Sequence, residues 1–198
     1  MIERLGQRWG RAIPVAAGVL LTAWGLLVAP FALPLLPMET YTRYAKALGV
    51  APSTAEAKNL AELPQFYADM HGWEELARDV SAAYLSIPEA ERPTTVAFVG
   101  NYGEAGALEL FAKRYPLPRP ISGHNSYWFW GVGGTPITTF IRLGGTPDRY
   151  RETYGDVTQV AVHTCRYCMP YENNLGIFVT RQRRVPIEQA WGDAKHFE

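Results

Sequence analysis

The sequence predicts an α/β protein with one N-terminal transmembrane helix, followed by a single domain on a mixed or partly parallel sheet. Three observations support this fold class. An uncharged apolar stretch lies near the N-terminus, strand-like and helix-like segments alternate after it, and 47% of the 198 residues are hydrophobic. This composition supplies a core and excludes a disordered chain. Because 19 basic residues balance 19 acidic ones, we expect no nucleic-acid partner.

The first predicted element is a membrane-spanning helix within residues 12–37. Ala12 to Met38 is a run of 27 residues without a charged side chain, and about 20 apolar residues suffice to cross a bilayer core. The far end should kink or stop the helix, because it holds Pro30, Pro34 and Pro37. A secretory signal peptide is the alternative, although its apolar region is usually shorter than this one.

The charges around this segment predict its orientation. Residues 1–38 hold three arginines against one glutamate, a balance of +2, and the remainder holds sixteen basic and eighteen acidic residues, a balance of −2. Basic residues before a span favour a cytoplasmic N-terminus, so residues 1–11 form a cytoplasmic basic flank. We therefore expect a single-pass protein of a bacterial inner membrane, with the lipid bilayer as a partner and an extracytoplasmic domain at residues 53–198.

Helical signals follow the span. Residues 38–52 form a juxtamembrane connection with a short helix at Tyr41–Leu48, and Ser53–Glu56 matches a capping box that opens another helix. From Trp73 the apolar residues recur at offsets of 3, 4, 7, 10 and 11 through Tyr84. That spacing is typical of an amphipathic helix with one buried face.

Strands and helices then alternate. Thr94–Val99 is a β-branched and apolar run that predicts a buried strand. The spacing of apolar residues from Leu108 to Tyr115 predicts a helix, which the prolines after it end. Alternation of this kind favours an α/β sheet. The remaining predicted elements are strands at Ile137–Leu143, Val157–His163 and Ile177–Thr180 and a terminal helix at Pro186–Phe197.

The first candidate site is the loop Gly100–Gly106, between a predicted strand and a predicted helix. Its spacing is G-x-x-G-x-x-G, which differs from the dinucleotide motif G-x-G-x-x-G. Glu104 falls in the first helical turn, where its charge complements the helix dipole and repels phosphate. The loop therefore predicts either tight packing of a turn or, with Tyr102, a site for a neutral polar ligand such as a sugar.

The second candidate is Ser122–Gly131, in which polar side chains precede a run of aromatic rings. Rings cover the apolar faces of a sugar, and amides and hydroxyls bind its hydroxyl groups. Core packing and a membrane interface use the same aromatic residues. His124 and Asn125 are the stronger functional candidates here, because a buried polar pair must find partners.

The third candidate is the C-x-x-C pair Cys165 and Cys168. A thioredoxin-type redox motif needs a helix that starts at the cysteines, whereas the sequence after them predicts a loop. A zinc site with His163 would lack a fourth ligand. A local disulfide or two structural thiols is the expectation in an exported domain, and we expect no metal and no cofactor. Glu172 follows at another strand end and completes the substrate-binding set: Tyr102, Glu104, His124, Asn125 and Glu172.

Five blocks follow one another along the chain: Leu63–Met70, Gly72–Leu76, Asn101–Ala107, Ser122–Gly131 and Cys168–Asn174. In this order and spacing they resemble the last span and C-terminal extracytoplasmic domain of bacterial membrane glycosyltransferases. The resemblance is to the family 39-like group, related to dolichyl-phosphate-mannose–protein mannosyltransferases and aminoarabinose transferases. It runs from the span to Lys195.

The resemblance implies transfer of a sugar from a polyprenyl-phosphate donor to a glycan or protein acceptor outside the cytoplasm. Members of this group carry their catalytic aspartate in a loop between early membrane helices of a large bundle. No residue of this chain matches that aspartate, so no catalytic residue is carried over. A single span also implies that other membrane subunits, or further helices, would supply the donor cavity.

Two alternatives remain open. One is a membrane-tethered, non-enzymatic module that binds glycans or another protein of the cell envelope. The other is a membrane-anchored thiol oxidoreductase that uses Cys165. The first predicts binding without transfer, and the second predicts disulfide reduction that requires the cysteine.

Overall fold

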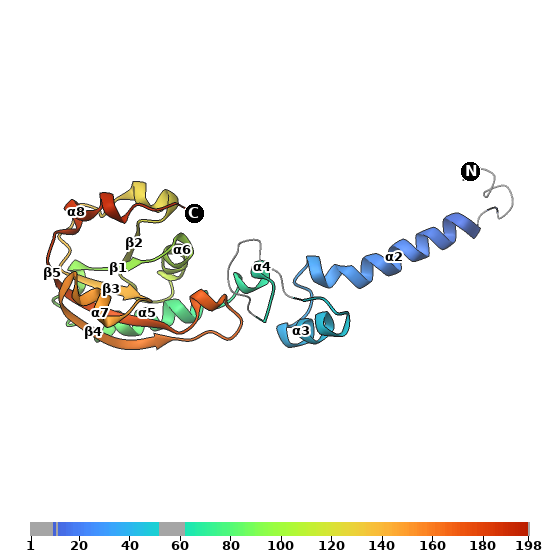
Figure 1. The fold of residues 1–198 in the computed structure, drawn as a ribbon, viewed down its shortest axis with the longest axis horizontal. Coiled ribbons are helices and arrows are strands. Elements are labelled where there is room, and N and C mark those ends of the chain that lie inside the picture. Colours follow the sequence, from blue (N-terminus) through green and yellow to red (C-terminus); the bar gives the residue numbers. More distant parts are fainter. Residues whose placement is uncertain (1–9, 11, 52–61, 198) are drawn as a thin grey trace. The chain divides into compact units, whose positions relative to one another are not determined.

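The computed structural model describes residue 10, residues 12–51 and residues 62–197. It divides into two compact units, Met1–Ser53 and Thr54–Glu198. The predicted α/β fold class, with one apolar N-terminal helix and one mixed sheet, is confirmed (Figure 1). The predicted basic flank, apart from Gly10, and the capping box at Ser53–Glu56 lie outside the described residues.

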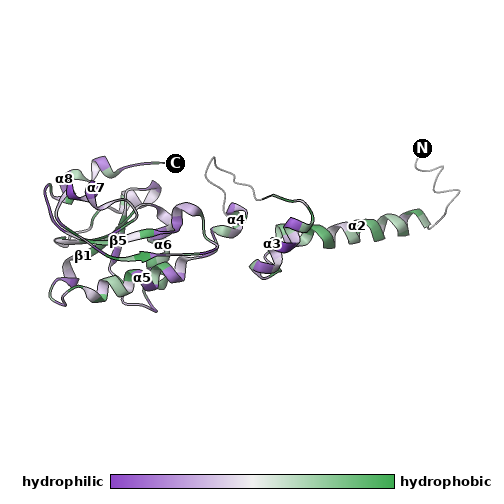
Figure 2. Ribbon diagram, turned by 60° about the horizontal axis from the view of Figure 1, so that its bottom comes forward, coloured by the Kyte–Doolittle hydropathy of each residue, from purple (hydrophilic) through white to green (hydrophobic). Residues whose placement is uncertain are grey.

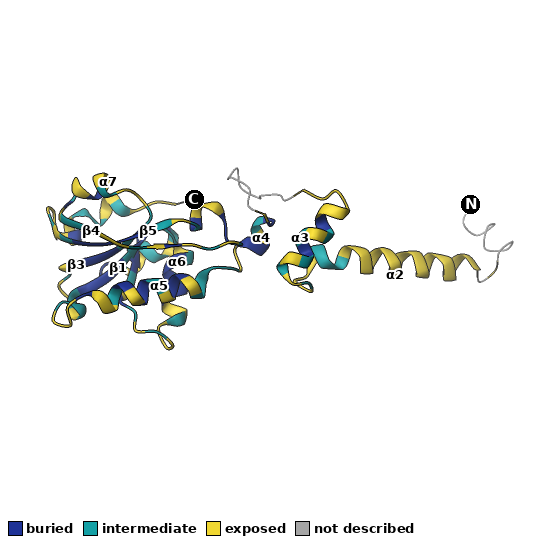
Figure 3. Ribbon diagram, turned by 90° about the horizontal axis from the view of Figure 1, so that it is seen from below, coloured by how far each residue is buried: buried dark blue, intermediate teal, exposed yellow. Residues whose placement is uncertain are grey.

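The N-terminal unit contains the apolar helix α2, Ala12–Ala32, and the helix α3, Met38–Ala47. None of the residues of α2 is buried, and the helix is green with hydrophobic residues in Figure 2 and yellow with exposed ones in Figure 3. Its length and composition suit either a membrane span or a signal sequence. Pro30 lies inside its last turn, and the predicted end near the proline cluster is confirmed.

The short helix α3 packs back on the end of α2. The Tyr44 hydroxyl donates a hydrogen bond to the Leu27 carbonyl oxygen at 2.5 Å, and the Phe31 ring lies 5.9 Å from the Tyr41 ring. Pro37 precedes α3 and has no N–H to pair. The predicted connection therefore contains an ordered helix held by aromatic contacts.

The second unit is built on one five-stranded sheet with the order β2-β1-β3-β5-β4. The strands β2, β1 and β3 are parallel, and β5 is antiparallel to both β3 and β4. This is a mixed sheet, as predicted. The strands are β1 Thr95–Val99, β2 Arg119–Ser122, β3 Thr139–Leu143, β4 Tyr154–His163 and β5 Leu175–Arg183.

Helices cover both faces of this sheet. The residues of α5, Trp73–Ser86, and α6, Tyr102–Phe111, pack with β1, β3 and β5 in one core cluster. The opposite cluster joins Phe140 and Phe178 to Tyr150 of α7, Pro147–Arg151, and Ile187 of α8, Ile187–Ala190. The central strands are accordingly dark blue in Figure 3. The remaining short elements are α4 Gln65–Ala68 and the 3-10 turns η1 Arg92–Thr94, η2 Asn125–Trp130, η3 Pro170–Glu172 and η4 Gly192–Ala194.

Two sequence predictions need correction. Strand β2 was not predicted, because prolines 118 and 120 indicated only the end of a helix. The structure places Pro120 in β2, which is an outer strand of the sheet. A residue without an N–H group is tolerated there. The terminal helix predicted at Pro186–Phe197 is wrong. The chain forms α8 and η4 instead, and the indole Nε1 of Trp191 donates to the Trp128 carbonyl oxygen at 3.0 Å.

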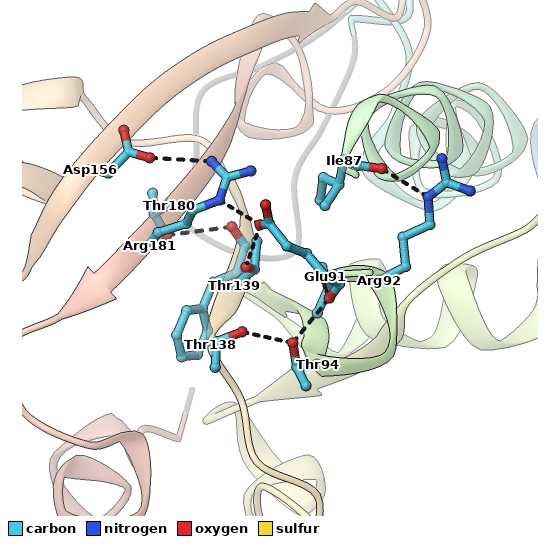
Figure 4. Close-up of polar contacts among 11 residues, drawn as sticks. Ile87, Glu91, Arg92, Thr94, Thr138, Thr139, Asp156, Thr180 and Arg181 are labelled. Carbon is cyan, nitrogen blue, oxygen red and sulfur yellow. Dashed lines mark hydrogen bonds and ion pairs between the residues drawn. The ribbon is translucent and has the colours of Figure 1, made fainter. Parts of the chain in front are cut away.

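A polar network holds the edge of the sheet where β1 and β3 begin (Figure 4). The Glu91 carboxylate accepts hydrogen bonds from Arg181 Nε at 2.7 Å and from the Thr139 hydroxyl at 3.2 Å. Arg181 also reaches Asp156 at 3.2 Å. These contacts connect the turn before β1 with β3, β5 and β4. They lie at the ends of the strands where β1 and β3 begin, and the opposite ends of these two strands take no part in the network.

Candidate functional site

A cavity of about 950 Å³ lies at the edge where the parallel strands β1, β2 and β3 end. Residues after each of these strands line it, because parallel strands bring their carboxyl ends to one edge of a sheet. We call it the polar cavity. All five residues predicted from the sequence line it: Tyr102, Glu104, His124, Asn125 and Glu172.

The first wall of the polar cavity is the start of α6, which is fixed by a capping box. The Asn101 side chain accepts a hydrogen bond from the Glu104 backbone N–H at 2.8 Å. The Glu104 carboxylate in turn accepts from the backbone N–H groups of Gly100 at 2.6 Å and Asn101 at 3.3 Å. Glu104 therefore has a structural role in addition to lining the cavity.

Glu104 is also a buried carboxyl group. Only 5% of the residue is exposed, and this burial raises the pKa of its carboxyl above the ordinary value of 4.5, although the two backbone hydrogen bonds oppose the shift. This wall of the cavity therefore presents a carboxyl group and no positive charge to a ligand.

The second wall comes from the loop after β4. The side-chain amide of Asn101 donates to the Glu172 carboxylate at 2.9 Å, across 71 residues of sequence. Glu172 is 7% exposed and lies in η3. This contact joins the loop after β1 to the loop before β5.

The third wall is His124, which follows β2. Its Nδ1 accepts a hydrogen bond from the Tyr102 backbone N–H at 3.3 Å. The His124 ring stacks on His196 with centroids 4.8 Å apart and planes 1° apart, and it lies 5.1 Å from the Tyr102 ring. Asn125 beside it has φ of 50°, a left-handed conformation that asparagine tolerates better than most residues.

Several lining residues were missed by the sequence reasoning. His196 belongs to the segment that was predicted as a helix, and its Nε2 lies 3.1 Å from the Gly100 carbonyl oxygen. Trp73 was predicted only as a residue of an amphipathic helix, yet it starts α5 at the cavity wall. The aromatic side chains near Trp73 and His196 were a signal for a binding site. Nothing in the sequence around these two residues, however, indicated that they lie at the ends of β1 and β2. The other lining residues not predicted include Gln65, Asp69, Asn101 and Tyr171.

The electrostatics of the polar cavity restrict its ligands. Its described lining carries the carboxylates of Asp69, Glu104 and Glu172 and two histidines, and it includes no lysine or arginine. Rings stand beside these groups, since Tyr102 is 56% exposed and Tyr171 is 40% exposed. The arrangement suits a neutral molecule with many hydroxyl groups and at least one apolar face.

The two cysteines lie outside this cavity. Both are free thiols in the structure, and Cys165 Sγ accepts a hydrogen bond from the Cys168 backbone N–H at 3.1 Å. Burial raises the pKa of the Cys168 thiol, which disfavours the thiolate that redox chemistry needs. His163, the other residue of the considered zinc site, pairs its Nδ1 with Asp79 at 2.7 Å. The disulfide stays a prediction.

Comparisons of the chain with models of protein families, with curated proteins and with solved structures found no match. The resemblance to membrane glycosyltransferases therefore stays a prediction, and the function has to be argued from the polar cavity.

Proposed function

We propose that the polar cavity binds a neutral sugar. The observation that supports this most directly is the lining itself, in which three carboxylates, two histidines and the amide of Asn101 stand beside Trp73 and Tyr102. Carboxylates accept hydrogen bonds from hydroxyl groups, amides both accept and donate them, and aromatic rings cover the apolar face of a pyranose. A phosphate would meet these carboxyl groups and, in the described lining, no lysine or arginine.

The proposal extends to the whole chain through the family resemblance. On that basis the domain is the extracytoplasmic, C-terminal part of a glycosyltransferase-like protein of a bacterial inner membrane, tethered by α2 with a cytoplasmic N-terminus. It would contact the acceptor glycan, or the sugar of a polyprenyl-phosphate donor, while the transfer itself is carried out by membrane helices that this chain does not contain. A membrane-tethered glycan-binding module without any transfer is the second candidate.

The binding test uses the full chain in lipid nanodiscs and methyl glycosides of glucose, galactose and mannose. Saturation-transfer NMR should detect at least one of these sugars. The Tyr102→Ala variant should lose most of the signal without a change in melting temperature, because the Tyr102 side chain is exposed. A matched control is Phe129→Ala, which removes a ring that is 68% exposed and does not line the polar cavity. Equal signals from both variants would contradict the proposal.

A second experiment separates the two candidate functions. Native membranes that contain the chain are supplied with a labelled polyprenyl-phosphate sugar, with and without Tyr102→Ala. The glycosyltransferase proposal expects label in an extracytoplasmic acceptor and a loss of that label in the variant. Sugar binding without any variant-dependent transfer would instead favour the binding module.

A further inference from the structure

A second cavity, of about 800 Å³, adjoins the polar cavity. We call it the apolar groove. Trp73 and Gly103 line both cavities, so the two share one wall. The groove is formed by the face of α6 and the turn before α5, with Met70, Gly106, Leu110 and Phe111 among its lining residues.

At this shared wall the indole of Trp73 lies close to the backbone of α6, because position 103 is a glycine. A Cβ at that position would lie 2.9 Å from Cη2 of the Trp73 indole, closer than such atoms approach. The Trp73 Nε1 donates to the Asp69 carbonyl oxygen at 2.6 Å, which fixes the indole against α6. Trp73 and Gly103 therefore lie where the polar cavity and the apolar groove meet.

The groove exposes apolar side chains that a ligand would cover. Leu110 is 72% exposed and Met70 is 56% exposed. Removing such surface from water is favourable in proportion to its area. Two of the charged residues at the groove have partners: Glu74 accepts from Arg114 at 2.6 Å and from the Tyr115 hydroxyl at 2.8 Å, and Arg166 lies 3.7 Å from Glu62. A third, Glu75, is exposed at the rim. The groove thus offers contact to an uncharged chain or ring.

We infer that the apolar groove holds the apolar aglycone of a neutral glycoside whose sugar occupies the polar cavity. This inference rests on the proposed sugar binding, and it specifies the ligand as an amphiphile whose two parts meet at Trp73. The acidic side chains of the groove, Glu74 and Glu75, and the carboxyl groups of the polar cavity both favour a ligand without a phosphate.

The test compares methyl, butyl and hexyl glycosides of glucose and of mannose, below their micellar concentrations. The full chain is held in nanodiscs, and empty nanodiscs measure partition into lipid. Burying one methylene contributes about 0.8 kcal/mol, which is up to about fourfold in affinity. In a groove open on one side we expect about twofold per methylene, so the hexyl glycoside should bind at least about tenfold more tightly than the methyl glycoside.

Leu110→Ser should flatten this dependence on chain length and leave the affinity for the methyl glycoside unchanged. The matched control is Leu85→Ser, which replaces a 47% exposed leucine of α5 that does not line the groove. Binding of the methyl glycoside with no gain for longer chains would overturn the inference and leave the proposed sugar binding intact. A gain that persists in Leu110→Ser, or that equals partition into empty nanodiscs, would also overturn it. Failure of every glycoside to bind would reject the proposed function as well.

Discussion

The side chains of Asn101 and Glu172 meet at 2.9 Å and join two loops that are 71 residues apart in sequence. Asn101 also caps α6, because its oxygen accepts from the Glu104 N–H. One side chain therefore begins a helix with its oxygen and connects the walls of the polar cavity with its nitrogen.

These two roles of Asn101 are separable by mutation. Asn101→Ala removes both and should lower the free energy of unfolding by about 1 kcal/mol through the lost cap, with a fall in melting temperature of about 2–4 °C. Asn101→Asp keeps a good capping oxygen but places a carboxylate against Glu172. We expect Asn101→Asp to fold with an intact α6 and to bind methyl glycosides more weakly, as circular dichroism and titration can show. An Asn101→Asp variant that binds like the wild type would contradict the role of the Glu172 contact.

The buried carboxyl of Glu104 should make folding pH-dependent. Because burial raises its pKa in the folded state, the folded protein binds the proton more strongly than the unfolded chain does. This contribution to stability is present at low pH and is lost as the pH rises from about 4.5 through the raised value. Glu104→Gln keeps a capping oxygen without the charge, so its stability relative to the wild type should increase across that range in thermal melts. A constant difference between the two proteins would exclude a raised pKa.

Glu91 should show the opposite dependence. Its hydrogen bond with Arg181 lowers the pKa of the Glu91 carboxyl below 4.5. The stability from this pair is therefore present above the unfolded pKa and is lost as the pH falls through the lower folded value. Glu91→Gln should lose less stability than the wild type on acidification below about pH 4.5. Thermal melts of both proteins at matched ionic strength measure this, and parallel pH profiles would argue against the pair shown in Figure 4.

Gly123 is a position where no side chain fits. A Cβ there would lie 1.8 Å from the Ala194 carbonyl oxygen, a backbone atom that cannot rotate away. Gly123→Ala should displace the segment that carries His196, lower the free energy of unfolding by about 1–3 kcal/mol and speed hydrogen exchange at Asn125, whose N–H pairs with His196. The control is Gly134→Ala, where the new Cβ meets nothing within 4 Å. Similar exchange rates in the two variants would show that the segment is not held at Gly123.

The two cysteines should differ in reactivity. Cys168 is 4% exposed and its thiol pKa is raised by burial, whereas Cys165 is partly exposed and lines the apolar groove. After reduction, iodoacetamide should modify Cys165 well before Cys168, and peptide mass spectrometry gives the order. The same measurement before reduction tests the predicted disulfide, because a bridged pair resists alkylation and is lighter by two hydrogen atoms. Faster modification of Cys168 would contradict its burial.

Local patterns predicted the elements with strong periodicity. The helix predicted from Trp73 and the strand predicted at Thr94–Val99 are confirmed within about two residues. The β-branched run and the helical spacing are properties of neighbouring residues, so one sequence is enough to find them. Strand β2 was not predicted, because Arg119–Ser122 is too short to show an alternating pattern and contains Pro120, which is uncommon in strands.

The candidate site was found only in part, for a physical reason. The five predicted residues line one cavity because parallel strands end at one edge, a consequence of topology that the alternation of elements indicates. His196 was beyond prediction, since its position depends on backbone pairing of the last segment with Gly123 and Asn125. It also depends on two hydrogen bonds in which the indole N–H groups of Trp128 and Trp191 each donate to the other residue's carbonyl oxygen. Contacts between residues so distant in sequence leave no local signal.

The two outer strands of the sheet are each unsuited to pairing with another chain. Pro120 deprives β2 of an N–H group, and an irregularity between Gln159 and Ala161 interrupts β4. An unbroken outer strand is a template for intermolecular association. The proline of β2 and the irregularity of β4 therefore disfavour edge-to-edge association of this sheet with the sheet of another copy.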